Sequence, residues 1–329
     1  MVAFRRPLPW RAVMDPADTE SLAAALLPLL PRAFPPHGGG IVACRLNEYT
    51  SSSPSLVVHL DAGDGAGHEV FIKLDRGRPD PEPRNRFGVD YSLAVHHRLL
   101  ARAPWPCPRA LGVVALGDPP RRALVMEHLG GCLRVGEAPD ESGIVAAAAW
   151  CGRYHAWAAG LIASPELDFL ARQDADTYRA WSARAAALAA AAGSTPAWLA
   201  RACAHHDAAA ARLAASDRTI LHGEFGVANV LWRDGAIFPV DWESAAVGPG
   251  AIDVAALVYG WPESIERRCR AAYWQARGTA PPPDDELVWG AALLHTGLRW
   301  LPAPGEPGGE RLPAGLEMLS RVAARLGLA

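Results

Sequence analysis

The first 130 residues alternate short apolar runs with polar segments, which is the pattern of an antiparallel sheet. Three β-branched or alternating runs come first, and clusters of Ser, Pro, Gly and Asp separate them. They cover residues 41–46, 55–60 and 69–74. A helix is predicted over 91–103, where apolar positions fall on one face, and two more strands are predicted over 110–116 and 122–128. This part of the chain therefore predicts a small sheet accompanied by one helix.

Long alanine-rich segments with helical spacing follow Gly130 and Gly131. They predict helices over residues 144–162, 178–192 and 197–215. Proline-rich loops then punctuate a C-terminal region that is again helical in pattern. Because 329 residues exceed the usual size of one hydrophobic core, we expect two domains, residues 1–130 and residues 131–329.

An apolar stretch at residues 22–30 follows three arginines near the start of the chain. Acidic residues between the arginines and this stretch, and Pro28 within it, interrupt the pattern of a secretory leader, so we predict an amphipathic helix. No run of 18 or more purely apolar residues is present, and we therefore expect no membrane span.

The composition is that of a folded globular protein, with 50% hydrophobic and 20% charged residues. A formal net charge of -3 offers no broad basic surface for nucleic acid and no polybasic run for a membrane, so a small-molecule partner is the simplest expectation. The 6 cysteines are widely spaced and form no CxxC pair, which favours reduced thiols in a cytoplasmic protein over a zinc site.

The segment 222–243 combines the residue types that phosphoryl transfer requires. It begins with His222 and Glu224, places Asn229 five positions after Glu224, and continues through a hairpin with an Asp-Gly turn to Asp241. One carboxylate meets the acceptor hydroxyl in this chemistry, while an amide oxygen and a second carboxylate hold magnesium against the phosphates. Each residue alone would only cap a turn or end a strand, so the interpretation depends on their order.

This order resembles the aminoglycoside phosphotransferase and choline kinase-like family, which is related to the protein kinases. The family motif is His-Gly-Asp, with Asn five residues beyond the Asp and a hairpin that ends in Ile-Asp-Trp or similar. The matching residues are His222-Gly223, Asn229, Asp241-Trp242-Glu243, Gly248-Pro249 and Asp253-Val254-Ala255. The resemblance implies an α+β, two-lobed protein kinase-like fold, with a small antiparallel-sheet N-lobe that binds nucleotide and a larger, mainly helical, catalytic C-lobe.

The resemblance also implies roles for individual residues of the segment. Glu224 takes the catalytic-base position, His222 orients the loop, and Asn229 and Asp241 are the ligands of magnesium (Mg2+). Glu224 departs from the family's aspartate: it keeps the charge, but its oxygens reach roughly one C–C bond further unless the backbone or rotamer compensates. Its ordinary pKa of about 4.3 leaves the carboxylate ionised at neutral pH.

Lys73 is the single lysine among 32 basic residues, all the others being arginine. It ends the run Phe71-Ile72-Lys73, which resembles the strand whose lysine contacts the α- and β-phosphates of the nucleotide. The alternative is an exposed lysine without a role. The family's partner for this lysine is a helix glutamate, and the equivalent position here is Ser92, so the partner is either missing or supplied by Asp90.

Two further nucleotide contacts are predicted only from the position of the residues along the chain. The serine-rich loop with Ser51, Ser52 and Ser53 occupies the phosphate-covering position, although it lacks glycine and serine hairpins are commonly only turns. Glu127 and His128 follow the last predicted strand of the N-lobe, where the backbone of such proteins pairs with adenine.

The acceptor site is not specified by the sequence. Ten of the 12 tryptophans lie from Trp150 onward and are compatible either with an aromatic wall or with ordinary helical core. The acidic residues that a polycationic acceptor would need are diluted by neighbouring arginines; they are Glu263, Glu266, Asp284, Asp285 and Glu286. The remaining histidines show no paired carboxylate or ligand spacing, and we interpret them as packed or surface residues: His96, His97, His155, His205, His206 and His295.

Two hypotheses from different classes follow. The first is an ATP- or GTP-dependent O-phosphotransferase that acts on a hydroxyl of a small metabolite or antibiotic-like natural product. The second is a kinase-like pseudoenzyme that binds nucleotide or another ligand without catalysis, which Glu224, Ser92 and the glycine-free loop favour. A Ser/His/Asp hydrolase is disfavoured because no GxSxG elbow is present.

Overall fold

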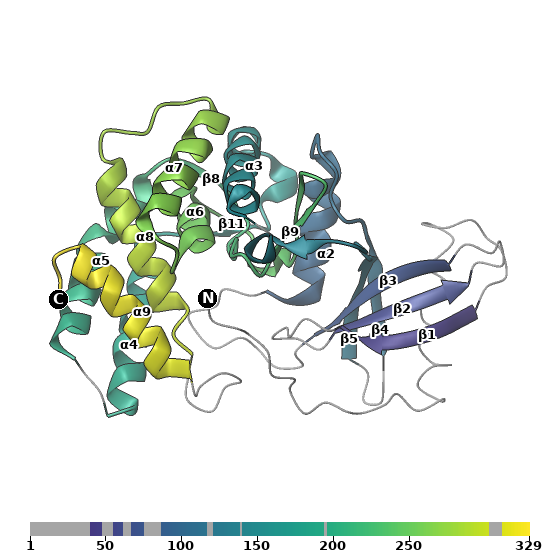
Figure 1. Ribbon diagram of the computed structural model, residues 1–329, viewed down its shortest axis with the longest axis horizontal. Helices are drawn as coiled ribbons and strands as arrows, with labels where there is room; N and C mark the ends of the chain where they lie inside the picture. Colours follow the sequence, from purple (N-terminus) through teal and green to yellow (C-terminus); the bar gives the residue numbers. More distant parts are fainter. Residues whose placement is uncertain are drawn as a thin grey trace. The chain divides into compact units, whose positions relative to one another are not determined.

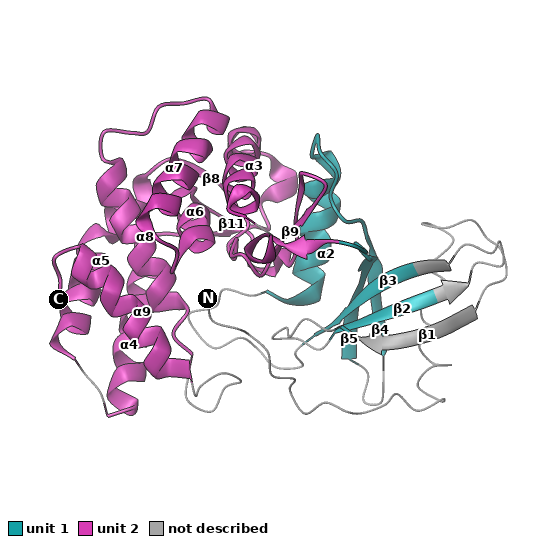
Figure 2. Ribbon diagram, in the orientation of Figure 1, with its two compact units in different colours: residues 1–80, 86–131 teal, residues 81–85, 132–329 magenta. Residues whose placement is uncertain are grey.

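The computed structural model describes residues 40–47, 55–61, 67–75, 87–116, 121–138, 140–193, 196–302 and 311–329. The chain divides into two compact units, shown in different colours in Figure 2. Unit 1 comprises residues 1–80 and 86–131, and unit 2 comprises residues 81–85 and 132–329. The predicted N-terminal helix and the loop with Ser51, Ser52 and Ser53 lie outside the described residues.

Unit 1 contains a five-stranded antiparallel sheet with the strand order β1-β2-β3-β5-β4 (Figure 1). The strands are β1 (Gly40–Leu46), β2 (Ser55–Asp61), β3 (Gly67–Leu74), β4 (Ala110–Leu116) and β5 (Arg121–Glu127). Successive side chains of β3 face opposite sides of the sheet. Val70 and Ile72 join one apolar cluster with Val125, whereas Phe71 packs against the other cluster with Leu124. The predicted antiparallel sheet is confirmed.

Helix α2 (Gly88–Arg98) covers one face of this sheet by placing Val89 in the second cluster. The prediction of a helix over 91–103 was therefore displaced toward the C-terminus. A separate 3-10 turn, η2 (Leu100–Arg102), follows α2, and Ala103 is extended. The residue after Ala103 is proline, which disfavours helical backbone at the position before it.

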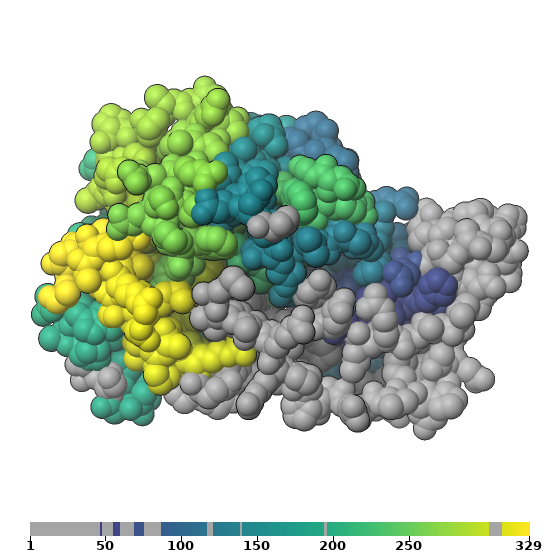
Figure 3. Space-filling model, viewed as in Figure 1, coloured from purple at the N-terminus to yellow at the C-terminus, as the bar shows by residue number. Residues whose placement is uncertain are grey.

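Unit 2 is mainly helical (Figure 1). Its helices are α3 (Ser142–Ala159), α4 (Ala175–Ala191), α5 (Ala197–Ala215), α6 (Ala251–Val258), α7 (Glu263–Arg277), α8 (Asp285–Arg299) and α9 (Leu312–Arg325). All residues of α8 from Val288 onward are buried, as expected of a helix surrounded by other helices. Figure 3 shows the atoms of α9 in yellow, beside the green part of the chain that contains α7 and α8.

Two small three-stranded sheets complete unit 2. One has the order β10-β9-β6 and the other the order β7-β11-β8. The strands are β6 (Leu133–Arg134), β7 (Ala171–Arg172), β8 (Arg218–Leu221), β9 (Val230–Arg233), β10 (Ala236–Pro239) and β11 (Ala246–Pro249). The hairpin of β9 and β10 turns at Asp234 and Gly235, both with positive φ, as the Asp-Gly sequence predicted.

Close packing of α3 against α7 depends on a glycine. A Cβ atom at Gly152 would overlap the backbone carbonyl oxygen of Tyr273, so a larger residue would push the two helices apart. This contact matters for the candidate site because α3 and α7 both contribute side chains to the cluster behind it.

No helix in the described part of the chain is long and apolar enough to cross a membrane. The described cysteines are free thiols, in agreement with the expectation of reduced cysteines; they are Cys107, Cys132, Cys151, Cys203 and Cys269.

Candidate active site

The loop between β8 and β9 contains the residues that the sequence singled out, and α6 anchors its backbone. Asp253 of α6 accepts hydrogen bonds from the backbone N–H groups of His222 (2.7 Å) and Gly223 (2.9 Å) and is fully buried. Burial by itself would raise the pKa of Asp253, but hydrogen bonds and the neighbouring His155 and His222 hold the pKa below its ordinary value. A buried carboxylate therefore fixes the start of the loop.

Gly223 allows the loop to pass close to the 3-10 turn η5 (Trp242–Ser244). Its φ of +85° lies in the left-handed region, and a Cβ atom there would overlap the carbonyl oxygen of Ser244. Both observations require glycine. The backbone on the N-terminal side of Glu224 is consequently held from two directions, by Asp253 and by Ser244.

His222 connects the loop to the end of the hairpin. Its Nδ1 accepts the backbone N–H of Glu224 (3.2 Å), so the proton is on Nε2, which donates to the carbonyl oxygen of Val240 (2.9 Å). The ring packs against Trp242, with 4.5 Å between ring centroids. Burial lowers the pKa of His222, and a neutral imidazole matches these two hydrogen bonds.

Asn229 and Asp241 lie next to each other across the hairpin. The backbone carbonyl oxygen of Asn229 accepts the N–H of Val240 (2.9 Å), one residue before Asp241. The side-chain Nδ2 of Asn229 donates to the carbonyl oxygen of Glu224 (3.0 Å), which fixes the orientation of the amide. Asp241 has left-handed backbone angles, φ 70° and ψ 62°, which are uncommon outside glycine and occur at functional sites. The hydrogen bonds thus place Asn229 beside the backbone of Glu224 and opposite Val240, the residue before Asp241.

Glu224 forms a buried ion pair that the sequence did not reveal. Arg299, the last residue of α8, places Nη2 at 3.0 Å from Oε1 of Glu224, and its Nη1 donates to the carbonyl oxygen of Gly223. Only 7% of Glu224 and 8% of Arg299 is exposed. One guanidinium therefore bonds to the Glu224 carboxylate and to the backbone immediately before it.

A chain of hydrogen bonds supports the loop from behind. His155 of α3 donates from Nε2 to Asp253 (3.2 Å), and its Nδ1 lies 3.0 Å from the hydroxyl of Tyr273 on α7. Arg277 donates to the same hydroxyl (3.2 Å) and pairs with Asp217. The expectation that His155 has no paired carboxylate was wrong, because its partner lies 98 positions away in the sequence.

Among the described residues, one group of three potential metal ligands lies close together: Cys151, His155 and Asp253. Cys151 Sγ is 3.7 Å from both ring nitrogens of His155, so it faces the ring and not the lone pair of either nitrogen. Both carboxylate oxygens of Asp253 already accept hydrogen bonds, and burial raises the pKa of Cys151 well above its ordinary value. The group is a packed hydrogen-bonded cluster, not a metal centre.

In unit 1, Lys73 lies on β3 opposite Ser55 of β2 and Leu124 of β5. Only 7% of the residue is exposed, although lysine is among the amino acids least often buried. The alternative of an exposed surface lysine is therefore wrong. Asp90, the nearby carboxylate, pairs with Arg122, and the Ser92 side chain is buried in α2.

Glu127 and His128 are anchored by other residues of unit 1. Glu127 accepts hydrogen bonds from the backbone N–H (3.3 Å) and Nε (3.4 Å) of Arg109. His128 Nδ1 lies 2.7 Å from the carboxylate of Glu69 on β3. These contacts fix the segment after β5, while its role toward adenine stays a prediction.

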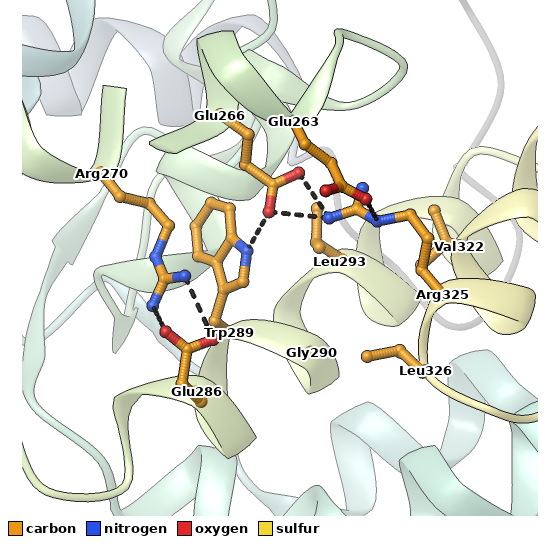
Figure 4. A pocket seen from close by; sticks show the side chains of 10 residues that line it. All are labelled: Glu263, Glu266, Arg270, Glu286, Trp289, Gly290, Leu293, Val322, Arg325 and Leu326. Carbon is orange, nitrogen blue, oxygen red and sulfur yellow. Dashed lines mark hydrogen bonds and ion pairs between the residues drawn. The ribbon is translucent and has the colours of Figure 1, made fainter. Parts of the chain in front are cut away.

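A pocket of about 310 Å³ lies elsewhere in unit 2, among α7, α8 and α9 (Figure 4). Its charged side chains pair with one another: Arg325 with Glu263 and Glu266, and Arg270 with Glu286. Trp289 donates to Glu266 at 2.6 Å. Each carboxylate of the acidic cluster noted in the sequence therefore contacts an arginine, since Asp284 pairs with Arg212 and Asp285 with Arg270, and these ion pairs reduce the negative charge offered to a polycationic acceptor.

An antiparallel sheet with one helix, a mainly helical unit, and a loop that joins a carboxylate to an Asn–Asp pair define the protein kinase-like class of phosphotransferases. A family model described as the phosphotransferase enzyme family matches residues 55–287, and the chain belongs to this family. A search of curated proteins gives no match.

Solved structures show the same fold over nearly the whole chain. The GDP and kanamycin complex of APH(2")-IIia has a TM-score of 0.65 at 10% identity, over 92% of this chain and 98% of that one. The spectinomycin phosphotransferase complex with ADP and spectinomycin has a TM-score of 0.59 at 12% identity, over 89% and 95%. Macrolide 2'-phosphotransferase MphH from Brachybacterium faecium has a TM-score of 0.51 at 20% identity, over 91% and 96%. These likenesses establish the α+β, kinase-like fold of the chain.

Proposed function

We propose that the protein is an ATP- or GTP-dependent O-phosphotransferase that acts on a hydroxyl group of a small metabolite or an antibiotic-like natural product. The observation that carries the proposal is the hydrogen-bonded segment of unit 2 that joins Glu224, Asn229 and the residue before Asp241. Membership of the phosphotransferase family supports it. The GDP, ADP, kanamycin and spectinomycin in the related structures support a nucleotide and a small hydroxylated acceptor.

Glu224 occupies the place of the catalytic base. The acceptor hydroxyl passes its proton to the Glu224 carboxylate, and its oxygen forms a bond to the γ-phosphorus. The bond from that phosphorus to the β–γ bridging oxygen breaks at the same time, and the nucleoside diphosphate leaves. Glu224 then returns the proton to solvent. Positioning and charge neutralisation supply most of the rate in this chemistry, so a glutamate held in a fixed place can serve as the base.

Asn229 and Asp241 fit magnesium by the chemistry of their donors. The bond from Asn229 Nδ2 to the Glu224 carbonyl leaves the amide oxygen turned away from that carbonyl. An amide oxygen and a carboxylate are the hard ligands that magnesium prefers, and the ion would neutralise phosphate charge. His222 holds Glu224 and the hairpin together through its two hydrogen bonds.

Unit 1 supplies the nucleotide contacts in this proposal. Lys73 binds the α- and β-phosphates, the Ser51, Ser52 and Ser53 loop covers them, and the backbone at Glu127 and His128 pairs with the base. Residues 1–130 then form the nucleotide-binding lobe and residues 131–329 the catalytic and substrate-binding lobe. The free thiols support a cytoplasmic location.

The test is transfer from labelled ATP or GTP, with magnesium, to a panel of hydroxylated compounds. We expect turnover by the wild type, and a loss of at least about 100-fold in kcat for Glu224→Gln, because the amide cannot accept the proton. Thermal stability with and without Mg-nucleotide reports binding separately from chemistry.

The two hypotheses give different outcomes. Stabilisation by nucleotide without transfer to any compound would support the binding-only pseudoenzyme, which the ion pair on Glu224 favours because it engages one of the base's oxygens. Turnover that Glu224→Gln abolishes would exclude it. Absence of both nucleotide binding and turnover contradicts the proposed function as a whole.

A further inference from the structure

The sequence predicts that Glu224 takes the position of the family's aspartate, and the ion pair with Arg299 suggests how the longer side chain is accommodated there. We propose that Arg299 is a positioning residue that turns the longer Glu224 side chain back toward the loop and holds its carboxylate at the place of the catalytic base. This inference rests on the proposed function and deepens it, since it concerns the same site.

The loop backbone cannot retract to accommodate the extra methylene. Asp253 holds the N–H groups of His222 and Gly223, and the carbonyl oxygen of Ser244 blocks any movement of Gly223 toward it. The difference of about one C–C bond must therefore be absorbed by the side chain.

Arg299 provides the constraint that such a side chain needs. Its Nη1 bonds to the Gly223 carbonyl oxygen and its Nη2 lies 3.0 Å from Glu224 Oε1, so the planar guanidinium fixes the carboxylate relative to the loop's own backbone. Because both residues are buried, water competes little with these bonds.

The two residues are coupled, and each requires the other. Glu224→Asp withdraws the carboxylate from Nη2 by about one bond and weakens the buried ion pair. Restoring the family's aspartate should therefore lower activity in this chain. Arg299→Met leaves a buried carboxylate that is free to change rotamer, and an error of about 1 Å at the reacting atoms costs on the order of 100-fold in rate.

The experiment is a double-mutant cycle with Glu224→Asp, Arg299→Met and the double variant, measuring kcat, the KM for nucleotide and the thermal unfolding midpoint. We expect each single variant to lose about 10- to 100-fold in kcat with the KM for nucleotide unchanged, and the double variant to lose no more than either single variant. The unfolding midpoint should fall in both single variants and partly recover in the double variant. Arg299→Lys should retain part of kcat, since an ammonium keeps the charge but cannot reproduce the two parallel hydrogen bonds of the planar guanidinium.

Arg270→Met is the matched control. Arg270 forms ion pairs with Asp285 and Glu286 at the opposite end of α8, so its loss should lower the unfolding midpoint without changing kcat.

The stability and activity cycles separate the possible failures. Additive changes of the unfolding midpoint would overturn the coupling of the two residues, whatever the activity. Coupled stability with an unchanged kcat in Arg299→Met would overturn the positioning role alone, and so would a Glu224→Asp variant more active than the wild type. If the wild type transfers phosphate neither to the panel nor to water, the proposed function fails and the positioning role with it, while the stability cycle still measures the ion pair.

Discussion

The geometry of the loop depends on the absence of a side chain at Gly223. Gly223→Ala would place a methyl group against the carbonyl oxygen of Ser244 in a backbone conformation that alanine rarely adopts. We expect the free energy of unfolding to fall by more than about 2 kcal/mol, because strain and overlap add. Urea denaturation monitored by tryptophan fluorescence measures the change.

Gly278 provides the control for this prediction. It also has a positive φ, +76°, at the end of α7, but no atom lies within 4 Å of a Cβ built there. Gly278→Ala should therefore cost only the conformational term, about 1 kcal/mol. Equal destabilisation by the two substitutions would show that the contact with Ser244 does not constrain the loop.

At the residue scale, the sequence identified the residues that follow one another along the loop and missed those that come from distant helices. Asn229 and Asp241 could be paired because a hairpin with a recognisable Asp-Gly turn joins them. Arg299 lies 75 positions from Glu224 and is one of many arginines, so nothing in the pattern distinguished it. The role of Asp253 required the fold as well, because its partners are backbone N–H groups.

At the scale of elements, the hydrogen-bond chain from α7 through α3 to α6 couples helix packing to the loop. Tyr273→Phe removes the hydroxyl that bonds to His155 Nδ1 and to Arg277, and leaves that ring nitrogen buried without its partner. We expect a loss of about 1–3 kcal/mol in the free energy of unfolding, measured by urea denaturation. We also expect a fall in kcat, because His155 holds Asp253 and Asp253 holds the loop.

Tyr259 is a suitable comparison, since its hydroxyl is buried and has no hydrogen-bond partner among the described residues. Tyr259→Phe removes a buried polar group that makes no bond, so its effect on stability should be close to zero or favourable. The proposed chain would be contradicted if Tyr273→Phe were equally harmless.

The predicted bounds of helices and strands were accurate where the apolar periodicity ended at a residue that disfavours the element, such as proline or glycine. The strand at 110–116 and the helix at 197–215 have the bounds expected. The helix predicted to begin at 178 begins three residues earlier, at Ala175. Asp174 caps it by accepting the backbone N–H of Thr177 at 2.8 Å, a local signal that apolar spacing alone does not register.

At the scale of the whole molecule, unit 2 buries several histidines in neutral form. Burial lowers the pKa of His155, His222 and His295, and it lowers the pKa of His206 to about 4. His206 lies 2.7 Å from the hydroxyl of Ser182, and its ring stacks on that of His295 at 5.5 Å. The stability of the unit therefore depends on keeping these rings uncharged.

Acidification should destabilise the protein well before its carboxylates titrate. The unfolded chain binds protons on these histidines near pH 6.5, whereas folded His206 does so only near pH 4, so the free energy of unfolding falls as the pH decreases through that window. His206 alone accounts for about 3 kcal/mol of this loss. Asp253 stabilises the folded state through its lowered pKa, and this stabilisation is lost only below about pH 3.8. Its titration therefore does not change the free energy of unfolding within the window. Urea denaturation at pH 7.5, 6.5, 5.5 and 4.5 measures the slope, which His206→Gln should reduce because glutamine keeps a polar contact for Ser182 and takes up no proton. A free energy of unfolding that stays constant from pH 7.5 to 4.5 would mean that the buried histidines bind protons as readily in the folded protein as in the unfolded chain.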